Sequence, residues 1–136
     1  MGIFGTAAPI IVDFNLILQY VTFILLIVGY VKRKPFKNHG YIMLTVLLIT
    51  VGTTLTVMAP RLLDALAYIG LGVIGHAAVG IIFILLGTLF AIRFITAVRS
   101  GKPLKCGTKN MMRIALVLWI IPMLFGTLLY IMAYVL

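Results

Sequence analysis

The chain has 136 residues, of which 64% are hydrophobic and only 10% are charged, whereas soluble domains are about half apolar and about a quarter charged. This composition excludes an ordinary soluble protein and predicts a single-domain integral membrane protein. The formal net charge of +9 comes from eleven Lys and Arg residues against Asp13 and Asp64, but these bases flank apolar segments, which indicates membrane orientation rather than nucleic-acid binding.

The first two apolar segments each match the ~20 residues that a helix needs to cross a hydrocarbon core. The first predicted helix covers about 13–31 and ends at the basic turn Lys32–Pro35. The second covers about 39–59, with Asn38 as its N-cap and Pro60 just past its end.

The apolar stretch over 62–98 is too long for one membrane-spanning helix, because at ~1.5 Å per residue it would be almost twice as long as the ~30 Å core is thick. We therefore expect a short interfacial helix over about 61–69 and a third spanning helix over about 76–98. The hinge between them is expected at Gly70, Gly72 and Gly75. A fourth helix over about 112–135 completes the predicted fold, an all-α membrane protein built as a four-transmembrane-helix bundle.

Basic residues gather in the first and third loops, while the N-terminal segment has none and the second loop has only Arg61. The positive-inside rule then predicts cytoplasmic first and third loops and extracytoplasmic N- and C-termini, in a multi-pass protein of the plasma or inner membrane. We expect the bases to bind anionic lipid headgroups. They are Lys32, Arg33, Lys34, Lys37, Arg99, Lys102, Lys105, Lys109 and Arg113.

Each predicted helix carries a stripe of polar or small residues at helical spacing, which in a membrane marks the face turned away from lipid. In chain order the stripes are Asn15, Gln19, Thr22 and Gly29; Tyr41, Thr45, Gly52 and Thr56; Gly72, His76, Gly80 and Gly87; and Trp119, Pro122, Met123, Gly126 and Tyr130. Close helix packing is the favoured interpretation, with Gly52, Gly72, Gly80, Gly87 and Gly126 as contact points. A cavity for a cofactor, lipid or substrate is the alternative.

Catalytic chemistry has little support in the sequence. No Ser-His-Asp or Cys-His set is spaced for nucleophilic catalysis, and no carboxylate falls in the middle of a predicted helix. Asp13 and Asp64 are both expected near the outer interface, where water reaches them. We therefore predict no catalytic residues and a protein that is not an enzyme.

The two histidines are the candidates for a cofactor. One haem iron needs both ligands on opposite faces of one ring, but His39 and His76 are predicted at opposite ends of the bundle. His76 alone would need a ligand from a partner subunit, and its alternative role is a hydrogen bond to Thr56 or Tyr130. No cofactor is predicted, and haem at His76 remains an alternative.

A copper site is the second alternative. His39 and Met43 share one helical face, and Cys106, Met111 and Met112 lie in or beside the facing loop. Imidazole, thioether and thiolate ligands together suit Cu(I).

The order of these features resembles a family of small four-helix membrane proteins known as domain of unknown function 420, which is associated with terminal oxidase genes. The residues that carry the resemblance are Pro9, Asn15, Gly29 with the basic turn, His39, Met43, Thr50, Gly75, His76, Trp119, Gly126 and Tyr130. The family is richer in histidine, at positions that are here Arg61 and about Thr108 or Lys109. The resemblance thus implies that only part of a family metal site is present, in a structural descendant.

From these features we expect a non-catalytic accessory subunit of a membrane oxidoreductase complex, most readily a respiratory terminal oxidase and less readily a membrane monooxygenase. Its partners would be the larger membrane subunits of that complex. The alternative function is a small haem- or copper-binding protein for electron transfer or cofactor delivery. A small transporter or lipid-binding protein is the third class, and it would need a continuous polar path that the sequence does not show.

Overall fold

The computed structural model describes residues 2–104 and 108–136, and this part of the chain is helical without any strand. In chain order the elements are α1 (Ile10–Val31), α2 (Phe36–Thr53), the π-helical turn η1 (Thr54–Met58), the 3-10 turn η2 (Ala59–Arg61), α3 (Leu62–Ile69), α4 (Leu71–Arg99) and α5 (Lys109–Tyr134). Four helical segments are long and apolar enough to cross a membrane: α1, the continuous segment Phe36–Asp64, α4 and α5. The predicted all-α architecture with four such helices is confirmed.

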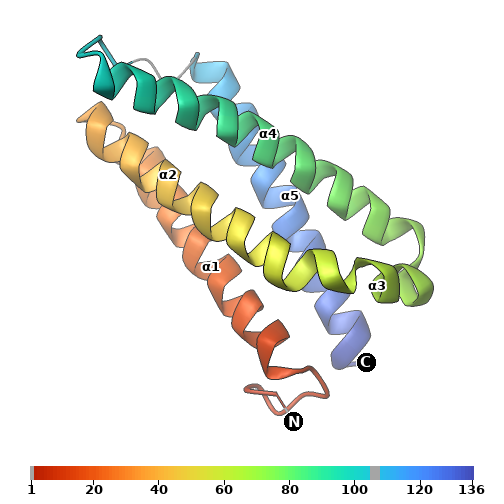
Figure 1. Cartoon of the computed structure of the whole chain (residues 1–136). Helices are drawn as coiled ribbons and strands as arrows, with labels where there is room; N and C mark the ends of the chain where they lie inside the picture. The colour runs from red at the N-terminus through yellow and green to blue at the C-terminus, as the bar shows by residue number, and fades with distance from the viewer. Residues whose placement is uncertain (1, 105–107) are drawn as a thin grey trace.

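The four long helices alternate in direction, as Figure 1 shows. α1 packs along α2, α4 packs along α5, and α2 and α4 join the two pairs. The end at which α2 and α5 begin is here called the basic end, because the basic turn before α2 and the basic start of α5 both lie there. The opposite end, which holds both chain termini, is called the terminal end.

The connection between α2 and α4 differs from the prediction in two ways. The helix continues past Pro60 instead of ending before it, because the wider turn η1 and the tighter turn η2 accommodate a residue without a backbone N–H. The hinge is also a single residue, Gly70, whose φ of 68° favours glycine. Gly72 and Gly75 are helical, so α4 begins at Leu71 and not near His76.

Helix starts at the basic end are set by two different residues. The residue that precedes α2 is Pro35, so the helix begins before the predicted N-cap Asn38, which is itself helical. Thr108 caps α5 by accepting a hydrogen bond from the backbone N–H of Met111 at 3.3 Å, and α5 therefore begins at Lys109, earlier than predicted.

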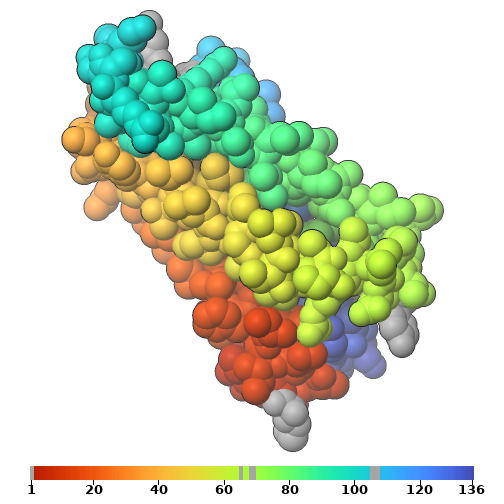
Figure 2. All heavy atoms as spheres, viewed as in Figure 1, coloured from red at the N-terminus to blue at the C-terminus, as the bar shows by residue number. Residues whose placement is uncertain are grey.

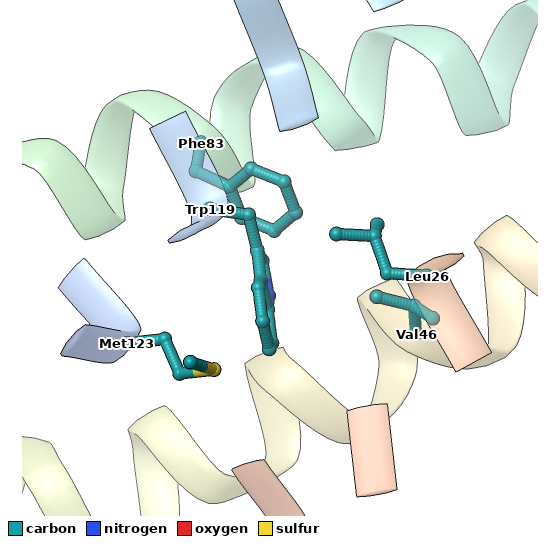
Figure 3. Packing of buried hydrophobic residues seen from close by; sticks show 5 residues of the cluster. All are labelled: Leu26, Val46, Phe83, Trp119 and Met123. Atoms are coloured by element: carbon teal, nitrogen blue, oxygen red, sulfur yellow. The ribbon is translucent and has the colours of Figure 1, made fainter. Parts of the chain in front are cut away.

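One buried cluster takes at least one residue from each long helix: Leu26, Val46, Phe83, Trp119 and Met123, drawn in Figure 3. The Trp119 ring lies parallel to Phe23 with 5.9 Å between centroids and edge-on to Phe83 at 6.5 Å. Aromatic pairs at these separations stabilise packing beyond the area that they bury. Trp119 therefore joins α5 to both α1 and α4.

The inward face of α1 is as predicted, whereas that of α2 is not. Thr22 and Gly29 are buried, and Gln19 donates to Thr53 at 3.2 Å. On α2 the predicted stripe of Tyr41, Thr45, Gly52 and Thr56 is exposed. The buried side of α2 is formed by His39, Gly40, Val46, Leu47, Thr50 and Thr53.

The prediction for α2 failed because threonine does not distinguish the two faces of a helix. Buried Thr50 and exposed Thr45 each donate to the carbonyl oxygen four residues earlier, so neither needs a partner on another helix. Figure 2 shows α2 on the front of the molecule with its outer side uncovered by any other segment.

At the terminal end, Asp13 has no solvent exposure, which contradicts the prediction of a solvated interfacial carboxylate. The hydroxyl of Tyr130 donates to it at 2.6 Å, and the backbone N–H of Phe4 donates at 3.3 Å. Thr6 lies 3.0 Å from the same hydroxyl. The N-terminal segment folds back over the carboxylate and excludes water, whereas Asp64 on α3 is exposed.

Candidate functional site

A cavity of about 420 Å³ lies inside the bundle at the basic end, and all four long helices contribute to its lining. Its volume falls within the ~300–1,000 Å³ range of small-molecule sites. His39 and Met43, two residues singled out in the sequence, both line it, together with Met112. The alternative prediction of a lined cavity thus has a physical counterpart here.

Small residues line part of the cavity, and two of them, Gly40 and Gly87, are in close contact with side chains of the facing helices. The ring of Phe94 lies against Gly40, so closely that a methyl group at position 40 would overlap it. Leu47 lies 2.9 Å from the position a Cβ atom would take at Gly87. Ala91 and Ala115 line the same space and leave it unfilled.

His39 is buried, with 6% of its surface exposed, and its imidazole is oriented by α1. Nδ1 lies 2.6 Å from the carbonyl oxygen of Gly29, and since a carbonyl only accepts, Nδ1 carries the proton and donates. In the neutral ring Nε2 then holds the lone pair. His39 thereby links α2 to α1 through this hydrogen bond, and it is also a polar group in the cavity wall.

The mouth of the cavity carries three positive charges, Arg33 and Lys34 from the first loop and Lys109 from the start of α5. Arg33 is held in place: its Nε donates to the carbonyl of Tyr30 at 2.9 Å, and its guanidinium lies 4.4 Å from the centre of the Tyr30 ring. A stacked guanidinium of this kind keeps its other N–H groups for a ligand.

The other predicted headgroup-binding residues do not line the cavity. Lys102 lines a shallow groove between α4 and α5 on the same end of the molecule, together with Arg93. Lys105 lies outside the described residues. The side chains exposed elsewhere on the surface are Lys32, Lys37, Arg99 and Arg113.

His76 lies near the start of α4, far along the bundle from His39, as the positions of α2 and α4 in Figure 1 show. Its ring stacks on Phe125 at 6.5 Å, and its Cε1 is 3.1 Å from where a Cβ atom would stand at Gly126. Nδ1 is buried and has no hydrogen-bond partner among the described residues.

The predicted partners of His76 are engaged elsewhere. Thr56 donates to the carbonyl of Gly52, and the Tyr130 hydroxyl donates to Asp13. Contrary to the prediction, neither residue forms a hydrogen bond with the buried Nδ1 of His76 in the described part of the chain.

The predicted copper ligands are only partly brought together. His39 and Met43 share the cavity with Met112, whereas Cys106 lies outside the described residues. Within the described ranges, no three His, Cys, Asp or Glu side chains gather as a metal-binding group.

The predicted packing glycines have different surroundings. Gly87 and Gly126 lie against side chains of neighbouring helices, and Gly72 is half-buried within α4. At Gly52 and Gly80 an added Cβ atom would meet nothing within 4 Å. The sequence also missed one close contact, that of Gly40 with Phe94, because Gly40 lies outside the stripe predicted for this helix.

Comparison of the chain with models of protein families, with curated proteins and with solved structures gave no match. The resemblance to the domain of unknown function 420 family therefore stays a prediction, and the function has to be argued from the residues.

Proposed function

We propose that the chain is a non-catalytic accessory subunit of a membrane oxidoreductase complex, and that it packs against a larger membrane subunit through α2. The observation that supports this proposal is the exposed α2 stripe, formed by Tyr41, Thr45, Gly52 and Thr56. Such residues are expected to avoid lipid, yet all four are exposed, although the Tyr41 ring also contacts Phe94 edge-on at 5.2 Å between centroids.

The stripe has the chemistry of a helix-packing surface. Gly52 and Thr56 are four residues apart, a small-xxx-small arrangement that lets another helix approach closely. The Thr45 and Thr56 hydroxyls already donate within the continuous helical segment Phe36–Asp64, Thr45 from α2 and Thr56 from η1, so a partner helix would bury them without leaving an unpaired donor. An interface based on close packing is therefore favoured over one based on hydrogen bonds.

A respiratory terminal oxidase is the proposed host, and a membrane monooxygenase is the second candidate. This part of the proposal rests on the resemblance to a family associated with terminal oxidase genes. We further propose, from the excess of bases in two loops, that the basic end faces the cytoplasm of the plasma or inner membrane and that both termini face outward.

The proposal is tested by purifying the tagged chain from its native membrane in a mild detergent. We expect stoichiometric larger subunits and the absorption bands of haem in the purified complex. Gly52→Leu should remove these subunits while the chain itself stays folded, because position 52 is open. Gly75→Leu, the same change at an open and exposed position on α4, is the control and should retain them. A monodisperse chain without partners would refute the proposal.

A second candidate function, copper binding, is favoured by one observation: His39, Met43 and Met112 line the same cavity. The hydrogen bond from Nδ1 to Gly29 fixes the ring and leaves Nε2 as a possible ligand, which is how metal-binding histidines are commonly oriented. Thioether and imidazole groups suit Cu(I).

Metal analysis of the purified protein distinguishes the two functions. A copper-binding protein would carry about one copper per chain and lose it in Met43→Leu, a change of similar volume. Met132→Leu, at an exposed position near the other end of α5, is the control. Absence of copper from the natively purified protein would exclude this candidate.

A further inference from the structure

The cavity at the basic end has a shape that a lipid chain would fill. Its lining extends along α4 from Phe94 to Phe83, which is roughly 16 Å at ~1.5 Å per residue. A hydrocarbon core is ~30 Å thick, so the cavity is about as deep as one leaflet. Below the mouth its lining is mainly Leu, Phe, Met and Val side chains, which favour an apolar occupant.

The charge at the mouth requires an anionic group on that occupant. Arg33, Lys34 and Lys109 lie at the level where the apolar lining ends, and the only carboxylate side chains of the chain, Asp13 and Asp64, lie toward the terminal end. Three cations without an acidic neighbour attract an anion, most strongly where the site borders a low-dielectric interior.

Their chemistry suits a phosphate. The guanidinium of Arg33, stacked on Tyr30, can offer paired N–H donors to two phosphate oxygens, and the ammonium groups of Lys34 and Lys109 add two further positive charges. A neutral headgroup would leave these charges uncompensated.

We propose that the cavity is a binding site for one anionic glycerophospholipid from the leaflet at the basic end. One acyl chain fills the space between the helices, and the phosphate lies among Arg33, Lys34 and Lys109. Binding at this site is more specific than the general attraction of basic loops to a membrane surface, because it needs both the three charges and the cavity. It does not depend on the accessory role proposed above.

Binding is tested with the delipidated full chain in detergent, with dioleoyl phosphatidylglycerol and dioleoyl phosphatidylcholine as probes. Native mass spectrometry should detect one retained phosphatidylglycerol per chain, and thermal unfolding should shift upward by several degrees. Phosphatidylcholine should give neither effect. Equal retention of both lipids, or retention of neither, would overturn the proposal.

Two matched sets of substitutions separate the mouth from the rest of the basic surface. The mouth variant carries Arg33→Gln, Lys34→Gln and Lys109→Gln. The control variant removes the same number of charges at exposed positions that do not line the cavity, with Lys32→Gln, Lys37→Gln and Arg99→Gln. The mouth variant should lose the bound phosphatidylglycerol, whereas the control should keep it. Equal losses would mean general charge attraction and contradict a defined site.

The chain-binding half of the proposal is tested separately with Ala115→Leu, which places a larger side chain in the cavity and leaves the mouth charges intact. This variant should remain folded, and the amount of phosphatidylglycerol that it retains should fall at least tenfold. Full retention would show that the acyl chain lies elsewhere and would refute the cavity as its site. If sodium oleate protects the native chain and phosphatidylglycerol does not, a fatty-acid site replaces the one proposed.

Discussion

The two ends of this bundle handle polar groups in opposite ways. At the terminal end, the Asp13 carboxylate is fully buried and receives hydrogen bonds from Tyr130 and from the folded-back N-terminal segment. At the basic end, the cations Arg33, Lys34 and Lys109 surround an apolar space and have no acidic neighbour within the described part of the chain. The Asp13 carboxylate finds its hydrogen-bond donors within the protein. The three cations at the basic end are instead available to bind an anionic ligand.

The difference indicates which polar residues hold the fold together and which are available for binding. A buried carboxylate with two donors ties α1, α5 and the N-terminal segment together. A basic rim around an unfilled space contributes little to packing, since an unfilled space forfeits contacts. We therefore expect substitutions at the terminal end to act on stability and those at the basic mouth to act on binding.

The largest loss of stability is expected from Tyr130→Phe. It removes the donor at 2.6 Å from Asp13 and leaves a buried carboxylate with only the Phe4 N–H. Losing one partner of a buried charged group is more costly than losing a neutral hydrogen bond, and we expect the melting temperature in detergent to fall by roughly 5 °C or more. Tyr134→Phe is the control, because no hydrogen bond of that hydroxyl is formed in the described structure. Equal shifts in the two variants would contradict a structural role for the Asp13 contact.

A smaller loss is expected from Gly40→Ala at the basic end. The added methyl group would overlap the ring of Phe94, so the contact between α2 and α4 must open, at a cost of about 1–3 kcal/mol. Gly80→Ala is the matched control on α4: nothing lies within 4 Å of the added atom, and alanine favours a helix interior over glycine by up to about 1 kcal/mol. Chemical unfolding of the two variants should therefore give changes of opposite sign.

The number of membrane-spanning helices could be predicted from the sequence, because hydropathy is averaged over a whole helix and depends little on individual contacts. The sequence was insufficient for Asp13 and for the α2 stripe. The burial of Asp13 depends on residues 2–9 folding back onto α5, which is a contact between distant parts of the chain. The orientation of α2 is ambiguous because its threonines satisfy themselves within the helix, so that polarity alone does not mark the inner face.

The cavity was also beyond sequence reasoning, although its components were visible. The sequence marks the basic residues of the first loop and of the start of α5, and it marks His39 and Met43. The lining includes Gly40, Gly87, Ala91 and Ala115 from three different helices, and only their three-dimensional register shows that they face one space. The signal in the sequence is the small residues that lie one to two helical turns from each basic cluster, toward the middle of the bundle, because such residues line the cavity.

The third prediction concerns His76, whose buried Nδ1 has no partner within the described residues. An unpaired buried polar atom costs free energy, so His76→Leu should leave the isolated chain as stable as before or stabilise it by about 1 kcal/mol. Chemical unfolding in detergent measures this change, with Phe125→Leu as the control because it removes the stacking ring alone. A clear loss of stability in His76→Leu would mean that the imidazole has a structural partner, and Asp13 would then not be the main polar anchor of the terminal end.

The smallest effect is expected from Thr53→Val, which removes the acceptor of the Gln19 side chain at 3.2 Å. Hydrogen bonds between membrane helices contribute about 0.6 kcal/mol on average, so unfolding should become easier by no more than about 1 kcal/mol. Thr45→Val provides the comparison, since that threonine bonds only within its own helix and is exposed. If Thr53→Val instead matched the loss from Tyr130→Phe, stability would be carried by polar contacts along the whole α1–α2 interface. The contrast between a polar anchor at one end and a binding space at the other would then no longer describe the molecule.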